Sequence, residues 1–299
     1  MRTKLKDLMM YYGVTMGKRF TTKEKNVFFE ALQKDYSQMG YHAKRDGKTN
    51  NIIIGDIDKS KMTLVTSYDT PVKMNFNAQY YPLNMRKNIK EESKNIYMLI
   101  LGYIVLFLLL LFMILYLKVS FPVMAALILL ITFLGYFVLK KRGNSFNFTR
   151  NSASLVLMHA IAQEREEQDI SFVLLDRTAN STIGLENAKD ILDTYRGTIV
   201  YLNCITSGDC FTVTTKKSVN KETEETVKKL LKTETGRKNQ KMVVENEADT
   251  YLRYFKNMVQ LSTGNIKDGD VVVHNTATKK DVIWDESLLK NLAETFINM

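Results

Sequence analysis

Two long apolar stretches stand out in the pattern of hydrophobic and polar positions. Residues 96–117 and 121–139 carry no charged side chain, and about 20 apolar residues suffice for a helix to cross a bilayer. Pro122 falls in the first turn of the second stretch, where its missing N–H is tolerated. Buried core helices are the alternative, but core helices of this length usually keep one polar face. The pattern therefore predicts a transmembrane helical hairpin over residues 96–140.

Basic residues around the hairpin predict its orientation. They gather at its two outer ends, at Arg86, Lys87, Lys90, Lys94, Lys140, Lys141 and Arg142. Lys118 alone lies in the connecting turn. Because loops rich in Lys and Arg stay in the cytoplasm, we expect a multi-pass protein of the cell membrane with cytoplasmic residues 1–95 and 141–299. Much of the net charge of +10 then faces anionic lipid, and no motif or basic stripe indicates nucleic-acid binding.

Outside the hairpin, the pattern alternates between strands and helices. Helices are predicted at residues 21–41, 152–168, 184–195, 221–240, 249–261 and 285–299, and strands within 50–57, 61–67, 169–176, 197–205 and 270–275. Thr22 and Asp285 are the expected N-caps of the first and last of these helices. This order predicts an α/β fold with a mainly parallel, mixed sheet flanked by helices. Since strands are predicted on both sides of the hairpin, residues 1–95 and 141–299 are expected to be two parts of one domain.

The cysteines and the N-terminus carry little functional information. Cys204 and Cys210 are the only cysteines, match no zinc-binding spacing and are too few for a disulfide scaffold. They are therefore interpreted as small residues near strand ends. Residues 1–13 contain no long apolar run, so no signal peptide is predicted.

The segment TLVTSYDTP, residues 63–71, is typical of a strand that ends in a polar turn. In α/β proteins the carboxyl ends of strands carry ligands and catalytic groups, so Asp69 is a candidate site residue. Ser67, Asp69 and His274 include the residue types of a hydrolase triad. No G-x-S-x-G motif surrounds Ser67, which argues against that interpretation.

A series of segments, taken in chain order, resembles one known family. They are GKRFTTKEKNVFFEALQKDYSQMGYHA, NIIIGD, LVTSYDTP, FTRNSASLVLMHAIA, ISFVLLDRTANSTIGLENAKDI, GTIVYLNCITSGD and VVVHNTATKKDVIWDESLLKNLAETFI. Together they resemble the di-zinc aminopeptidase and glutamate carboxypeptidase-like exopeptidases, which include glutaminyl cyclase. The resemblance covers most of the sequence outside the hairpin, although no single motif is intact. It implies a zinc-peptidase fold.

The resemblance also implies where the metal site of that family would fall. Ser67 replaces the zinc-binding histidine of a His-x-Asp strand end, while Asp69 keeps the aspartate that orients this histidine. Arg150 stands at the position of the metal-bridging aspartate, where a guanidinium repels divalent cations. One alternative for Asp69 is that it simply caps a turn. Because Asp69 and Arg150 would face one pocket with opposite charges, we predict an ion pair between them.

The remaining site positions are also changed. Thr178 and Ala179 correspond to the general base and a metal-binding glutamate, and Asn203 corresponds to a further aspartate ligand. His274 corresponds to the final histidine and is the one ligand retained, although a lone histidine here is more often an ordinary strand-end residue. Two zinc ions need several carboxylates and imidazoles, and activation of a metal-bound water needs a base. The resemblance thus implies a degenerate, non-catalytic member without a metal site.

We therefore predict a membrane-anchored pseudo-peptidase that needs no cofactor and acts as a binding or scaffold subunit for a peptide or membrane partner. In the resembled fold, the connection that here carries the hairpin runs beside the active-site mouth. The former substrate cleft is thus expected near the cytoplasmic membrane surface, where a membrane-embedded partner, a peptide segment or an anionic headgroup could dock. The alternative is an active membrane-bound metallo-aminopeptidase, or another hydrolase, with a rebuilt site that would need zinc. A channel is not indicated, because the two apolar helices offer no polar pathway.

Overall fold

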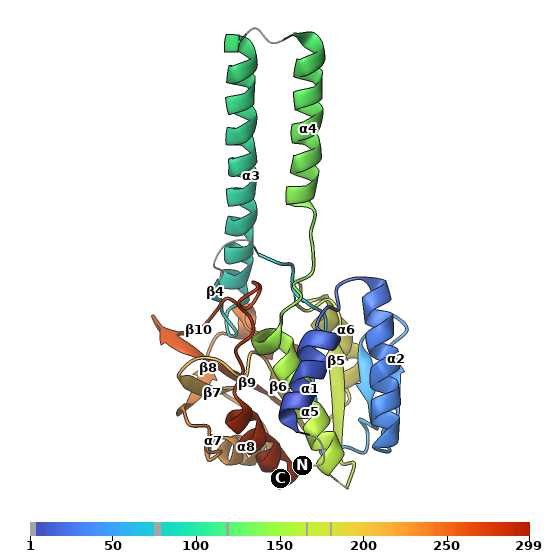
Figure 1. Ribbon diagram of the computed structural model, residues 1–299. Coiled ribbons are helices and arrows are strands. Elements are labelled where there is room, and N and C mark those ends of the chain that lie inside the picture. Colours follow the sequence, from blue (N-terminus) through green and yellow to red (C-terminus); the bar gives the residue numbers. More distant parts are fainter. Residues whose placement is uncertain (1–3, 75–78, 118–119, 166, 180) are drawn as a thin grey trace.

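The computed structural model describes residues 4–74, 79–117, 120–165, 167–179 and 181–299. Two long helices project side by side from a body in which strands and helices alternate (Figure 1). The helices are α1 (Leu5–Met10), α2 (Thr22–Gln38), α3 (Met85–Leu117), α4 (Phe121–Leu139), α5 (Ala153–Glu164), α6 (Ile183–Leu192), α7 (Lys221–Leu231) and α8 (Glu286–Ile297). Short π-helical segments lie at Tyr11–Thr15 and Phe148–Ser152, and 3₁₀ turns lie at Glu247–Asp249 and Tyr251–Tyr254.

In the described part of the chain, ten strands form one mixed sheet. They are β1 (Ala43–Arg45), β2 (Ile52–Ile54), β3 (Met62–Ser67), β4 (Gln79–Tyr80), β5 (Ile170–Leu175), β6 (Thr198–Leu202), β7 (Cys210–Lys216), β8 (Lys238–Val244), β9 (Met258–Lys267) and β10 (Asp270–His274). The main order is β1-β2-β5-β3-β6-β9-β10-β4, with β7 and β8 added beside β9. Only the central strands β5, β3, β6 and β9 run parallel in that order, with Leu64 opposite Phe172 and Val200. Since β3 lies between β5 and β6, strands that precede and follow the long helices share the sheet.

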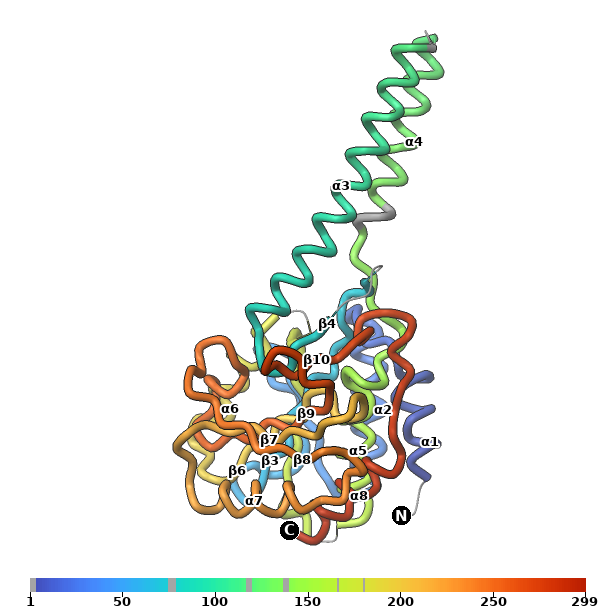
Figure 2. Tube along the Cα trace, turned by 90° about the vertical axis from the view of Figure 1, so that its left-hand side faces the viewer, coloured from blue at the N-terminus to red at the C-terminus, as the bar shows by residue number. Residues whose placement is uncertain are grey.

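Helices cover both faces of this sheet. Leu64 and Val65 are adjacent in β3, so they point to opposite faces and join separate hydrophobic clusters. The Leu64 cluster includes side chains of α1, α2, α5, α7 and α8. The Val65 cluster includes side chains of α6 and of the turn Tyr251–Tyr254. In Figure 2, α6 accordingly lies on the other side of the sheet from α1 and α2.

Several predicted elements are confirmed, with shifted ends. Asp285 caps α8 by accepting a hydrogen bond from the backbone N–H of Leu288 at 3.0 Å. The cap of α2 is Thr21, one residue before the predicted position, and it forms a capping box with Glu24. The helix predicted at 221–240 ends at Leu231 as α7, because the chain then turns and adds β8 to the sheet.

The helix predicted at 249–261 is wrong. Two 3₁₀ turns occupy its first part, and β9 begins at Met258. Residues 258–264 are buried throughout, because β9 pairs with β6 on one side and with β7 on the other. Sheet pairing on both sides overrides the helical spacing of the apolar residues that precede it. Helix α1 and strands β1, β4, β7 and β8 were not predicted.

Helix α3 passes from the body into the projecting pair without a break. Its 33 residues span about 50 Å, and its start at Met85 precedes the apolar stretch by 11 residues. Among the described residues it is the one helix that is long and apolar enough to span a membrane; α4 is apolar over its whole length. The two helices touch at Gly135, where an added Cβ atom would lie 2.4 Å from Cε2 of Tyr103. Lys118 of the predicted turn lies outside the described residues.

Candidate functional site

Residues Thr178 and Ala179, just after β5, are held by opposite charges from two sides. The Asp69 carboxylate, beyond the end of β3, accepts hydrogen bonds from the backbone N–H groups of Thr178 at 3.2 Å and Ala179 at 3.1 Å. The guanidinium of Arg150, in the π-helical segment Phe148–Ser152, donates to the carbonyl oxygen of Ala179 at 3.3 Å. Both residues are described, and no ion pair joins them, so the predicted Asp69–Arg150 pair is wrong. The two charges instead bind the backbone of the same residue, Ala179.

The side chain of Arg150 is 5% exposed and is surrounded by aromatic and neutral polar groups. Its guanidinium carbon lies 3.4 Å from the ring centroid of Tyr80, and its Nη1 donates to Oδ1 of Asn203 at 3.4 Å. The Tyr80 hydroxyl contacts the same Asn203 oxygen at 3.2 Å and the Tyr251 hydroxyl at 3.0 Å. Within the described residues, no carboxylate forms an ion pair with Arg150. The site therefore contains a buried cation whose direct partners are neutral.

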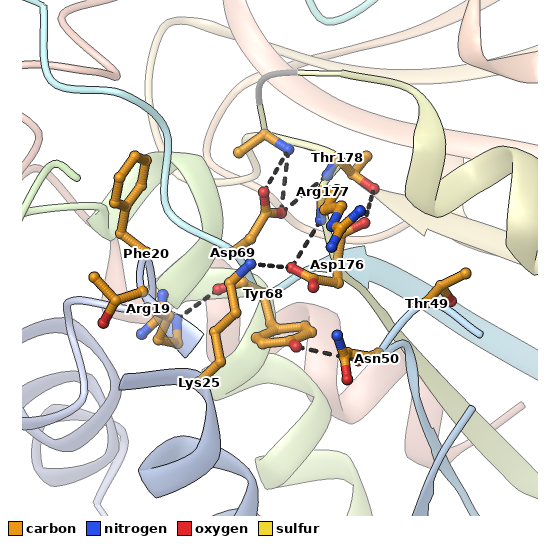
Figure 3. A network of polar contacts seen from close by, with 12 residues as sticks. Arg19, Phe20, Lys25, Thr49, Asn50, Tyr68, Asp69, Asp176, Arg177 and Thr178 are labelled. Carbon is orange, nitrogen blue, oxygen red and sulfur yellow. Dashed lines mark hydrogen bonds and ion pairs between the residues drawn. The ribbon is translucent and has the colours of Figure 1, made fainter. Parts of the chain in front are cut away.

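Asp69 lies in a second polar network, which also contains Lys25, Asp176 and Thr178 (Figure 3). Lys25 of α2 forms an ion pair with Asp176, which directly follows β5, and Asp69 points to the backbone of Thr178 (Figure 3). Burial and the neighbouring charge of Asp176 raise the pKa of Asp69 to about 6, although Lys25 and the backbone N–H groups of Thr178 and Ala179 lower it. Asp69 is thus largely ionised at neutral pH, and its hydrogen bonds hold the loop after β5 in place.

A cavity of about 250 Å³ lies beside Arg150, and we refer to it as the Arg150 cavity. Its wall includes Tyr80, Thr178, Ala179, Tyr251, Thr276 and Ala277 from the body, and Met85, Asn88, Ile89, Glu91 and Glu92 from the first turns of α3. The same helix that carries the long apolar stretch therefore forms one side of this cavity. A cavity of about 230 Å³ next to Asp69 is lined by Arg19, Lys25, Arg177 and other residues, and Ser181 borders both cavities.

Two of the predicted site residues, Ser67 and His274, are not among the residues that line the Arg150 cavity. Ser67 is buried at the end of β3, and His274 is exposed at the end of β10, opposite Gln79. Neither lines the Arg150 cavity or the smaller cavity next to Asp69. Since the Asp69 carboxylate binds backbone N–H groups, these three residues do not form a Ser-His-Asp triad.

The residues at the predicted ligand positions do not fit a two-zinc centre. They supply a hydroxyl at Ser67 and Thr178, a methyl group at Ala179, an amide at Asn203 and a guanidinium at Arg150. The one imidazole, that of His274, is exposed at the end of β10. In the described ranges, no group of three or more His, Cys, Asp or Glu side chains is placed to hold a metal ion. Zinc sites are built from such side chains, and a guanidinium within 3.4 Å of Asn203 adds repulsion.

Two buried charged residues near the site were not predicted. Arg19 is 0% exposed and donates to the carbonyl oxygens of Tyr12 at 2.8 Å, of Tyr68 at 2.6 Å and of Met16. Asp281 is 2% exposed, and its Oδ1 accepts from the backbone N–H of Thr149 at 2.8 Å. Both lie in polar segments, GKRF and TKKD, which are typical of surface loops. No signal in the sequence separates them from exposed residues.

The cysteines lie near strand ends, as predicted. Cys204 follows β6 and Cys210 begins β7, and both are buried free thiols. Burial raises the pKa of Cys204 to about 12, although the nearby Arg150 charge lowers it. Cys204 is therefore a neutral thiol at physiological pH, and it contacts Nη1 of Arg150 at 3.9 Å.

Comparison with solved structures identifies proteins with a similar fold. The glutaminyl cyclase of Tannerella forsythia matches with a TM-score of 0.58 at 11% identity, over 99% of this chain and 96% of that one. A Zn-dependent exopeptidase from Parabacteroides distasonis matches with a TM-score of 0.54 at 10% identity, over 98% and 94%. The LapA aminopeptidase of Legionella pneumophila matches with a TM-score of 0.53 at 10% identity, over 98% and 67%. No protein-family model and no curated protein sequence matches the chain. The chain thus has the zinc-peptidase fold, as the sequence resemblance implied.

Proposed function

We propose that this chain is a membrane-anchored pseudo-peptidase that binds a peptide or membrane partner through its aminopeptidase-like part. The position of Arg150 is the observation that carries the proposal. A buried guanidinium replaces the bridging carboxylate of the resembled family, and Ala179, held by Arg150 and Asp69, replaces a metal-binding glutamate. A site of this composition keeps one metal-ligand position, His274, and no general base, but it does supply a cavity with a fixed charge.

A zinc measurement on the purified full-length protein tests the loss of catalysis. We expect far less than one zinc ion per chain and no aminopeptidase or glutaminyl cyclase activity, because every ligand position except His274 holds a group that does not bind zinc, and one histidine is too few for a zinc site. His274→Ala should leave both results unchanged. Stoichiometric zinc, together with an activity that a chelator and His274→Ala both abolish, would support the alternative of an enzyme with a rebuilt site.

Membrane attachment is proposed from the surface of the projecting helices. Leu108 and Leu109 of α3 and Leu129 of α4 are more than half exposed, with many neighbouring apolar side chains. Exposed apolar surface of this extent is unfavourable in water. We therefore propose two spans that enter and leave on the cytoplasmic side.

Labelling in intact cells tests this topology. A Ser120→Cys variant should react with a membrane-impermeant thiol reagent added outside, because Ser120 lies between the two spans. The matched Lys141→Cys variant should react only after the membrane is opened. Both native cysteines are buried and give a low background. Equal outside labelling of both positions would contradict the hairpin.

A further inference from the structure

The Arg150 cavity carries unpaired charges of both signs. Arg150 has only neutral direct partners, and Asp281 beside it is largely protonated at neutral pH, because burial raises its pKa to about 8. On the α3 side, Glu91 and Glu92 line the cavity, and neither forms an ion pair with a described residue. Burial raises the pKa of Glu92, and the positive charge of Lys141 lowers it. A ligand with an anionic and a cationic group would compensate both sets of charges.

The cavity lies at the depth of lipid headgroups if the hairpin spans a bilayer. The apolar stretch of α3 begins at Ile96, and its residues 96–117 extend about 33 Å, close to the thickness of a hydrocarbon core. Glu92 and Ile89 precede Ile96 by four and seven residues, or by about 6 and 10 Å along the helix. The polar layer on each side of a bilayer is about 5–7 Å thick. The α3 wall of the cavity is therefore level with the headgroups and with the water just below them.

We propose that the Arg150 cavity binds the headgroup of an aminophospholipid, with a phosphate oxygen against Arg150 and the ammonium group toward Glu91 and Glu92. This inference rests on the membrane attachment proposed above and names the ligand of the same site. Arginine suits phosphate, because its planar donors match two oxygens at once. The volume of about 250 Å³ equals about eight water volumes, which leaves room for a phosphoethanolamine group. The glutamates distinguish this ligand from an acidic lipid, which they would repel.

Titration of the full-length protein in detergent micelles tests the proposal. The probes are dihexanoyl phosphatidylethanolamine, dihexanoyl phosphatidylglycerol and the water-soluble glycerophosphoethanolamine, with binding measured by calorimetry. We expect the ethanolamine lipid to bind more tightly than the glycerol lipid, and Arg150→Gln to weaken it by at least about tenfold, the effect of losing a charge-assisted hydrogen bond. Arg86→Gln is the matched control, because Arg86 lies on α3 outside the cavity and pairs with Asp249. It should leave the affinity unchanged.

A second variant keeps the test independent of any structural role of Arg150. In Glu91→Gln/Glu92→Gln, the preference for the ethanolamine lipid over the glycerol lipid should disappear. Equal losses of affinity in the Arg150 and Arg86 variants, or an unchanged preference in the double variant, would overturn the proposal.

Arg150-dependent binding of the dipeptide alanylalanine without lipid binding would assign the cavity to a peptide instead. If the thiol labelling above fails while glycerophosphoethanolamine still binds through Arg150, the membrane attachment is wrong but the chemistry of the cavity stands.

Discussion

Replacing Arg19 with methionine is expected to lower the free energy of unfolding by about 4 kcal/mol. Arg19 joins the π-helical segment before α2 to the end of β3 by donating to the carbonyl oxygens of Tyr12, Met16 and Tyr68. Methionine fills a similar volume but leaves these oxygens without the guanidinium donor, and each unsatisfied buried group costs about 1–3 kcal/mol. Burial lowers the pKa of Arg19 to about 10, so relief of charge desolvation offsets part of the loss.

Thermal and denaturant unfolding of the detergent-solubilised protein measures this effect. Arg196→Met is the matched control, because Arg196 is exposed after α6, and exposed substitutions usually change stability by less than about 0.5 kcal/mol. Similar stability of the two variants would show that the Arg19 hydrogen bonds add nothing. The hydrogen bonds between Asp69 and the loop after β5 should also weaken in the Arg19 variant, since Tyr68 precedes Asp69 directly.

Replacing Asp281 with asparagine is expected to stabilise the protein increasingly as the pH rises. Burial raises the pKa of Asp281 to about 8, while hydrogen bonds from Thr149 lower it, and its Oδ2 has no partner among the described residues. Between about pH 4 and pH 8, the folded state therefore binds more protons than the unfolded state, so the free energy of unfolding falls as the pH rises. Asparagine keeps the oxygen that accepts from Thr149 but does not ionise. Relative to the wild type, the variant should gain about 5 kcal/mol between these pH values.

The control for this series is Asp268→Asn, which changes an exposed aspartate between β9 and β10. Its backbone φ of +51° suits asparagine as well as aspartate. Its unfolding curves should follow those of the wild type at every pH. Because the pKa of Asp69 is raised to about 6, Asp69 also lowers the free energy of unfolding as the pH rises. This contribution is the same in all three proteins, so it cancels when they are compared. A parallel pH dependence of the Asp281 variant and the wild type would contradict the prediction.

Local patterns predicted most of the elements near the site. The strand that contains Leu64 and the helix capped by Asp285 follow from short-range periodicity and capping, and the two long apolar helices follow from the length of their uncharged runs. The helix predicted at 249–261 failed because β9 pairs with strands on both sides, and such partners are distant in sequence. The ion pair between Asp69 and Arg150 failed for a related reason. Opposite charges indicated attraction, but the backbone of Ala179 lies between them and satisfies both.

The sequence by itself determined the alternation of strands and helices, the two apolar stretches and the composition of the altered site, since each depends on residue type and local spacing. Only the tertiary structure decided which of these residues meet. It turned His274 to the surface, stacked Arg150 on Tyr80 and made the first turns of α3 a wall of the cavity. The physical reason is that burial and charge compensation depend on segments such as β4, α3 and the loop after β5, which come together only in the folded sheet.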